Sequence, residues 1–198
     1  MNNINMMIKE GYELLEKENV TEACTKWLMA WDQLKNAAKD MKVNSIEELE
    51  DNFEDGIELL SNWVQDLEME LENAGLEDKE FFLKRRVYVN EFCSILKNSD
   101  QFIIMSMKLA EAESYFELGN VEESEKLFSK LAEDYNRSIW PFLKWGDVYC
   151  LSSILRTRKD LINVNKSLEI YKKGLGIEKE FDYILEDRIK DLEKIKVQ

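Results

Sequence analysis

Pairs of acidic residues are the side chains in this sequence whose spacing could support chemistry. Glu68 and Glu72 are one helical turn apart, as are Asp66 and Glu70, so each pair would share one face of a helix. Two neighbouring carboxylates can act as a general acid and a general base. A glutamate-rich helix produces the same pairs on a solvated face, and we interpret them in that way.

A partial calcium-loop pattern is the second candidate for chemistry. Asp51, Asp55 and Gly56 match part of the D-x-[DN]-x-[DN]-G pattern. That pattern, however, places Phe53 where an oxygen ligand is required and Asn62 where the bidentate glutamate should be. We therefore predict no EF-hand and no metal site.

The sequence contains no histidine, which excludes many classes of enzyme. Ser-His and Cys-His nucleophilic pairs, H-E-x-x-H zinc helices and Glu-x-x-His di-iron bundles all require this residue. Neither G-x-x-x-x-G-K nor G-x-G-x-x-G occurs, so no nucleotide-binding loop is visible. Cys24, Cys93 and Cys150 are far apart within apolar helical patterns and predict small buried residues. We expect a protein that is not an enzyme and has no cofactor.

The composition predicts an all-α protein. The chain has 198 residues, of which 44% are apolar and 34% charged, with one proline and seven glycines. A protein built of β-sheets would need more glycine and proline for its turns. No Gly/Ser/Pro-rich linker interrupts residues 1–198, so we predict one domain. No run of about 20 apolar residues and no signal pattern occurs, which predicts a cytoplasmic protein without a membrane partner.

A helical hairpin recurs in the sequence at a spacing of 34 residues. Gly146 lies 34 residues after Ala112, and Tyr149 lies 34 residues after Tyr115. Gly119 marks a turn after the first of these helices. The residues expected in the second helix that follows are Ser124, Phe128 and Leu131. A small residue on one helix lets the next approach closely, which explains why small and aromatic positions recur together.

This register resembles the tetratricopeptide repeat. Phe142, Trp145, Gly146 and Tyr149 are similar to its W-x2-L-G-x2-Y signature. The resemblance implies antiparallel helical hairpins stacked as a short right-handed solenoid, with residues 181–197 as a C-terminal capping helix. The chain is also similar to the helical-repeat regions of bacterial SEC-C motif proteins, although their Cys-rich ending is missing, so no metal role transfers.

The resemblance is weaker outside residues 105–175. Near the N-terminus, Gly11 takes the small position and Trp27 a second-helix position, while Glu18 replaces the turn glycine. After Gly146 the second helix arrives late, which predicts a long loop or a helix extension over residues 154–165. The residues of that late helix are Ser167, Tyr171 and Gly174. Residues 44–100 are repeat-like only, and residues 39–58 could form a short helix, an acidic loop or an element that blocks a groove.

The resemblance implies a scaffold that binds a protein or peptide on a concave face lined by the first helices. The side chains that it places there are Ile8, Tyr12, Leu15, Leu109, Glu113, Phe116, Trp140, Leu143 and Asp147. This set mixes apolar and acidic groups without paired lysine and arginine, so we do not expect capture of a peptide carboxylate. The expected partner is a basic or mixed polar protein or peptide. The oligomeric state does not follow from the sequence.

The charge of the chain is concentrated in one segment. Of the net charge of −14, residues 44–80 contribute −13, through 14 acidic residues and Lys79. Such a field disfavours nucleic acid and anionic membranes and attracts basic proteins. An alternative function is therefore an acidic inhibitor or decoy that binds a basic protein through this segment, although the carboxylates could equally form the solvated face of a helix. The acidic-surface residues expected are Glu58, Asp66, Glu68, Glu70 and Glu72.

Overall fold

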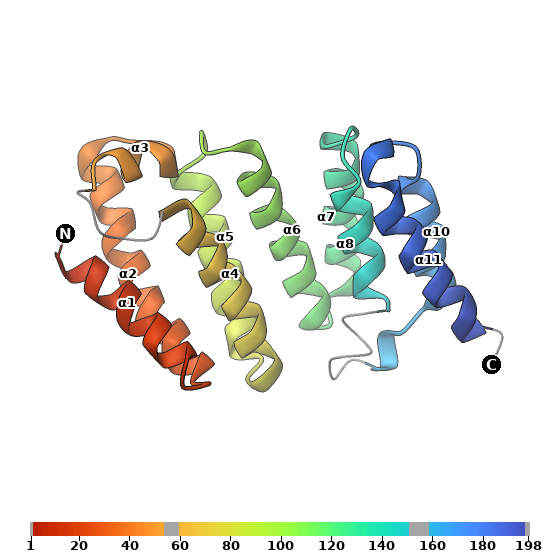
Figure 1. Cartoon of the computed structure of the whole chain (residues 1–198), viewed down its shortest axis with the longest axis horizontal. Coiled ribbons are helices and arrows are strands. Elements are labelled where there is room, and N and C mark those ends of the chain that lie inside the picture. Colours follow the sequence, from red (N-terminus) through yellow and green to blue (C-terminus); the bar gives the residue numbers. More distant parts are fainter. Residues whose placement is uncertain (1, 54–59, 151–158, 197–198) are drawn as a thin grey trace. The chain divides into compact units, whose positions relative to one another are not determined.

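The computed structural model describes residues 2–53, 60–150 and 159–196, and every regular element within these ranges is a helix (Figure 1). This confirms the prediction of an all-α protein for the part of the chain that is described. Contacts between residues divide the chain into two compact units, Met1–Ser114 and Tyr115–Gln198. The single domain and the solenoid stay predictions. Among the described helices, none combines the length and the apolar character needed to cross a membrane.

The first unit is built from two helical hairpins, a short helix between them and most of a further helix. Its elements are α1 (Asn2–Leu15), α2 (Val20–Met41), α3 (Ile46–Asp51), α4 (Leu60–Glu77), α5 (Glu80–Ile95) and α6 (Gln101–Glu117), whose last turn belongs to the second unit. Helix α1 pairs with α2, α4 pairs with α5, and α2 packs against both α4 and α5 (Figure 1). One continuous core of buried apolar side chains joins these helices.

The approach of α1 to α2 depends on Gly11. A β-carbon at this position would overlap the indole ring of Trp27, which is fully buried. The Trp27 indole N–H also donates a hydrogen bond to the Ile8 carbonyl, at 2.9 Å. The residues predicted at the small position and at the second-helix position are therefore in contact, because only glycine leaves room for the ring.

The two turn positions singled out in the sequence have a left-handed backbone conformation. Gly119 has φ 85°, and Glu18, which replaces the turn glycine in the N-terminal hairpin, has φ 62°. This left-handed region favours glycine, since a β-carbon there crowds the backbone. The N-terminal hairpin therefore carries a small strain that the middle one avoids.

Residues 39–53 contain a short helix that packs against the core. Helix α2 ends at Met41, and the Ser45 hydroxyl caps α3 by accepting a hydrogen bond from the Glu48 N–H, at 3.1 Å. Ile46 and Leu49 are buried, and the Ile46 N–H donates to the Ser99 hydroxyl at 2.9 Å. Of the three possibilities left open, the short helix is correct as far as residue 53. Residues 54–59, and with them the predictions for Asp55, Gly56 and Glu58, lie outside the described residues.

The second unit is also helical. Its remaining elements are α7 (Val121–Asp134), α8 (Trp140–Val148), η1 (Lys159–Leu161), α10 (Val164–Gly174), η2 (Lys179–Phe181) and α11 (Asp182–Lys196). Helix α8 packs against α7 and α10, and α11 packs against α10. A β-carbon on Gly146 would overlap the Tyr171 ring, and the Ser167 hydroxyl donates to the Gly146 carbonyl at 2.8 Å. The late second helix is therefore confirmed as α10, while residues 151–158 are not described.

Candidate functional site

A groove of about 360 Å³ lies between α2 and α5 in the first unit. Its lining residues are Leu28, Trp31, Asp32 and Lys35 from α2, and Glu80, Leu83, Lys84, Val87, Tyr88 and Glu91 from α5. The Trp31 and Tyr88 rings are buried and meet edge to face, with their centroids 5.0 Å apart. Leu83 and Val87 are 47% and 60% exposed. The groove therefore combines a fixed aromatic floor with accessible aliphatic side chains.

Helix α5 exposes these side chains because it is apolar on more than one face. Its buried side is formed by Phe81, Phe82, Tyr88, Val89 and Phe92. Leu83 and Val87 are four residues apart and share another face, which the neighbouring helices leave accessible. A helix that packed only by its core stripe would carry polar residues at these two positions.

Charged residues border the groove and pair with one another. The Lys35 ammonium lies 2.7 Å from an Asp32 carboxylate oxygen and 2.9 Å from Glu91. The Trp31 indole N–H donates to the other Glu91 oxygen at 2.8 Å. Burial lowers the pKa of Lys35, but hydrogen bonds and charges of Asp32 and Glu91 outweigh it and raise the pKa above 10.5. The charged rim therefore holds Trp31 in place and keeps Lys35 protonated.

A buried arginine forms a second cluster in the first unit. Arg85, on α5, is 1% exposed, and its guanidinium donates to Glu68 and Glu72 on α4 and to Glu113 on α6. The Nε–Glu68, Nη2–Glu72 and Nη2–Glu113 distances are 2.7, 2.6 and 3.0 Å. Burial by itself lowers the pKa of Arg85, but the three negative charges outweigh it and hold the pKa above the usual arginine value. The cluster joins three helices through charge-assisted hydrogen bonds.

The same three carboxylates could in principle hold a hard cation. Oxygen atoms of Glu68, Glu72 and Glu113 lie within 4.8 Å of one another, and such oxygen sets suit divalent cations. The Arg85 guanidinium lies among these oxygens and makes an ion pair with each carboxylate. We therefore assign the cluster to the stability of the fold, with arginine as its cation.

This arrangement corrects part of the predicted acidic surface. Glu68 and Glu72 are directed into the Arg85 cluster, and their side chains are only 16% and 15% exposed. Asp66 accepts a hydrogen bond from the Tyr12 hydroxyl at 2.6 Å, and Glu70 is half-buried. The sequence pattern placed Glu68 and Glu72 on a solvated face because it could not show that a buried arginine faces them.

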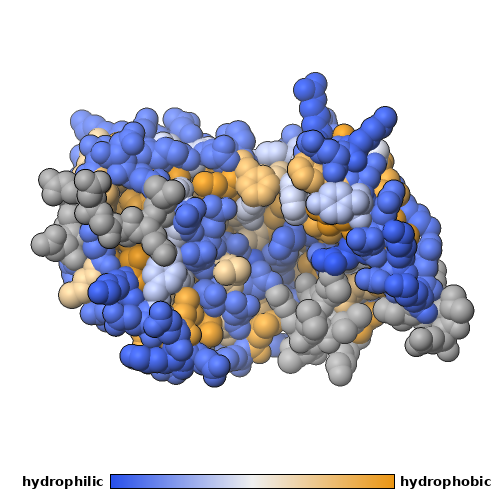
Figure 2. All heavy atoms as spheres, viewed as in Figure 1, coloured by the Kyte–Doolittle hydropathy of each residue, from blue (hydrophilic) through white to orange (hydrophobic). Residues whose placement is uncertain are grey.

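The residues expected on a concave face are mostly part of the packing within each unit. Ile8, Leu109, Phe116 and Leu143 are buried apolar residues, and Glu113 is buried against Arg85. The half-buried members of the set are Tyr12, Leu15, Trp140 and Asp147. The buried side chains offer no contact surface, which corrects their assignment as partner-binding residues. In the view of Figure 2, α1 and α4 lie toward the reader, and the surface over them is mainly hydrophilic with small separate apolar areas.

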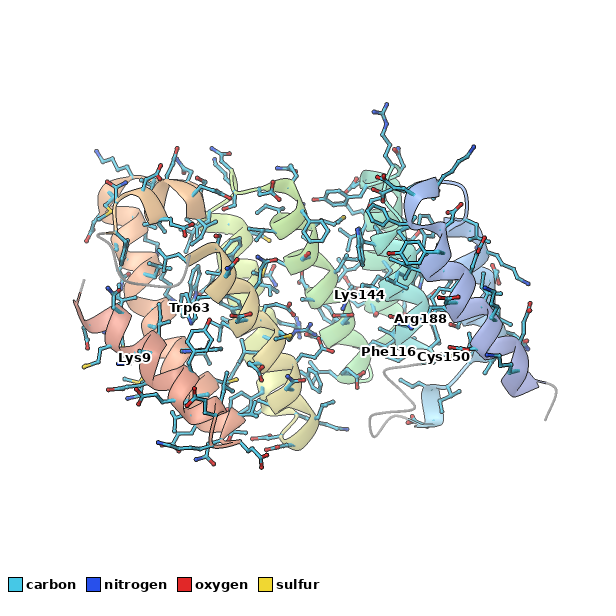
Figure 3. All side chains as sticks on the ribbon, in the orientation of Figure 1. Lys9, Trp63, Phe116, Lys144, Cys150 and Arg188 are labelled. Carbon is cyan, nitrogen blue, oxygen red and sulfur yellow. The ribbon has the colours of Figure 1, made fainter. Side chains whose placement is uncertain are left out.

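Trp63, on α4, is fully buried in the first unit. In Figure 3 it lies between α1 and α4, and its ring meets that of Trp27 edge to face, with centroids 6.3 Å apart. Its indole N–H has no hydrogen-bond partner among the residues that the structure describes. Trp63 is therefore a core residue of the first unit.

Carboxylates in the second unit are also held by neighbouring side chains. Glu125 accepts hydrogen bonds from the Trp145 indole at 2.5 Å and the Tyr149 hydroxyl at 2.7 Å, and pairs with Lys166 at 3.0 Å. Burial raises the pKa of Glu125, but these hydrogen bonds outweigh it and lower the pKa below 4.5. Asp147 is bound by Tyr171 and by Arg188, which Figure 3 labels. These carboxylates connect helices and are not arranged as an acid-base pair.

The prediction of buried cysteines is confirmed for Cys24 and Cys150 but not fully for Cys93. Cys24 and Cys150 are buried and Cys93 is half-buried, and all three are free thiols. Burial raises the pKa of Cys24 to about 12 and that of Cys93 to about 11. Thiols with such pKa values are poor nucleophiles at neutral pH, since the thiolate is the reactive form.

Sequence reasoning missed Arg85 and the exposed pair Leu83 and Val87. Arg85 falls on the same helical stripe as Phe81, Phe82 and Tyr88, and an arginine within an apolar stripe is a usable signal of a buried ion cluster. Leu83 and Val87 gave a weaker signal, since single exposed apolar residues are common on protein surfaces.

In comparisons with known proteins, no protein-family model, no curated protein and no solved structure matches this chain.

Proposed function

We propose that this protein is a non-enzymatic protein-binding module made of tetratricopeptide-like hairpins, and that the α2–α5 groove is its contact surface. The observation that carries this proposal is the exposure of Leu83 and Val87 beside the buried Trp31 and Tyr88 rings. Leu83 and Val87 form an accessible apolar surface one helical turn long, and a partner that covers it gains free energy by removing that surface from water.

The size of the gain can be estimated from exposure. Fully burying a valine or leucine contributes about 1.5–3 kcal/mol. Because Leu83 and Val87 are each about half exposed, covering both would contribute roughly 2 kcal/mol before any gain from the partner's own side chains. A dissociation constant of about 1 μM corresponds to a binding free energy of about 8 kcal/mol, so these two side chains would supply about a quarter of it.

The charged residues of the groove support a binding role over a catalytic one. An amine nucleophile needs a lowered pKa, whereas the pKa of Lys35 is raised by its carboxylate partners. The Lys84 ammonium lies 3.5 Å from a Glu80 carboxylate oxygen and 4.0 Å from the centre of the Phe81 ring, so it is held by contacts within α5. These side chains are suited to orienting a partner and to excluding wrong ones.

The groove replaces the two surfaces inferred from sequence as our proposed contact region. Of the residues predicted on a concave face, Ile8, Leu109 and Leu143 are buried in the core. Of the residues predicted to form the acidic surface of a decoy, Glu68 and Glu72 form ion pairs with Arg85. The groove keeps its apolar residues accessible.

The test is affinity capture with the purified protein, followed by reconstitution of each captured protein from purified components. Leu83→Asp should remove binding of a true partner, while Met69→Asp should not, because Met69 is 49% exposed on α4 but does not line the groove. Isothermal titration calorimetry with wild type and both variants gives the three affinities. If no captured protein binds again after purification, or if both variants bind as wild type does, the proposal is refuted.

A further inference from the structure

The groove has the length and walls of a site for one further helix. Its lining extends along α5 from Glu80 to Glu91 and along α2 from Leu28 to Lys35. At 1.5 Å per residue, these segments are about 16 Å and about 10 Å long, which matches two to three helical turns. A helix laid between two others packs its side chains into the grooves of both.

The chemistry of the walls favours a helix over an extended peptide. Both walls are α-helices, whose backbone N–H and C=O groups are already hydrogen-bonded within the helix, so the groove offers no edge for strand addition. Recognition of a proline-rich strand uses exposed aromatic faces. Trp31 and Tyr88 are each 1% exposed, and the Trp31 N–H is bound to Glu91. What the groove offers is the pair Leu83 and Val87, which suits apolar side chains spaced by one helical turn.

The charged residues at the rim of the groove indicate the charge of the helix that would bind there. The rim holds three carboxylates, from Asp32, Glu80 and Glu91, against two ammonium groups, from Lys35 and Lys84. Lys35 pairs with both Asp32 and Glu91, and Lys84 pairs with Glu80. Three carboxylates therefore share two ammonium groups, which leaves the rim with an excess of one negative charge. The whole chain carries −14, which attracts cationic partners and opposes approach of a second copy of the same chain.

We infer that the α2–α5 groove binds a basic amphipathic helix of a partner protein. The apolar face of that helix covers Leu83 and Val87, and its lysine or arginine side chains meet Asp32, Glu80 and Glu91. This inference rests on the proposed function and narrows it to one class of partner and one mode of recognition.

The test uses three fluorescein-labelled peptides of about 16 residues, which is the length of some four helical turns. The first has leucines at i, i+3, i+4 and i+7 with lysines on the other faces. The second replaces every lysine by glutamate, and the third keeps the composition but scrambles the leucine spacing. Fluorescence anisotropy measures the affinity of each peptide for the intact chain, for Val87→Asp and for the matched control Met69→Asp, which introduces the same charge outside the groove.

We expect Val87→Asp to weaken binding of the basic peptide by at least about tenfold and Met69→Asp to change it by less than about twofold. Because each variant adds a carboxylate, long-range attraction for this peptide increases in both, so a loss in Val87→Asp alone reports the apolar contact. The glutamate and scrambled peptides should each bind at least about tenfold more weakly than the basic peptide. Circular dichroism confirms that both variants keep their helices.

Equal binding of the basic peptide to all three proteins would overturn the inference, as would tighter binding of the glutamate or scrambled peptide. Self-association of the chain that Val87→Asp abolishes, measured by analytical ultracentrifugation, would overturn it too, because the occupant would then be a second copy. If a reconstituted partner depends on Leu83 while no basic helical peptide binds, the inference fails and the proposed function stands. If neither binds, both fail.

Discussion

Replacement of Arg85 by methionine should strongly destabilise the first unit. The change removes the guanidinium that donates to Glu68, Glu72 and Glu113, while methionine keeps much of the apolar volume of the stem. Breaking a buried ion cluster from one side costs about 3–5 kcal/mol, because the remaining charges stay buried. The partly exposed pair of Lys84 with Glu80 on the same helix provides the contrast, since Lys84→Met should cost below about 0.5 kcal/mol.

Urea unfolding followed by circular dichroism measures this difference. With a slope of about 1–3 kcal/mol per molar urea, a loss of about 4 kcal/mol lowers the unfolding midpoint by roughly 2 M. Hydrogen exchange of the α4 and α5 amides assigns the loss to the first unit, which matters because the chain contains two compact units.

A second variant tests whether the unpaired carboxylates cause the loss of stability. The quadruple variant combines Arg85→Met with Glu68→Gln, Glu72→Gln and Glu113→Gln, which removes the three like charges. Because glutamine keeps the shape of glutamate without its charge, this variant should recover most of the lost urea unfolding midpoint. The reasoning is refuted if Arg85→Met unfolds at the same urea concentration as wild type. It is also refuted if the quadruple variant is no more stable than the single one at neutral pH.

Three further predictions concern the turns, a close helix contact and a carboxylate. Glu18→Gly should raise the free energy of unfolding by about 1 kcal/mol and Gly119→Ala should lower it by a similar amount, as measured in urea, because both positions have positive φ. Gly146→Ala should lower the thermal unfolding midpoint, with a cost of about 1–3 kcal/mol, because its β-carbon overlaps the Tyr171 ring; an unchanged midpoint would contradict that packing. Since the folded-state pKa of Glu125 is below 4.5, its stabilisation is present above that pH and is lost as the pH falls through the folded value. Acid titration followed by tryptophan fluorescence should therefore show a smaller loss of stability in Glu125→Gln than in wild type.

Local features of the fold could be predicted because they depend on short spacings. The small residues Gly11 and Gly146 face the aromatic residues Trp27 and Tyr171, as the repeat register predicts. The left-handed turn at Glu18 also follows from its alignment with Gly119. In each case the residues that meet belong to one hairpin, so helical periodicity and one turn are enough to bring them together.

The sequence by itself determined that the chain is helical, where its hairpins turn and that its charge lies in one segment. Only the tertiary structure decided which carboxylates face solvent. Helical periodicity shows that residues share a face but not which distant helix covers that face, so the position of Arg85 in an apolar stripe signals a buried cluster while its partners on α4 and α6 were not predictable. The α2–α5 groove depends on the same kind of pairing, since Trp31 and Glu91 are 60 residues apart in the chain and meet only through the packing of α2 against α5.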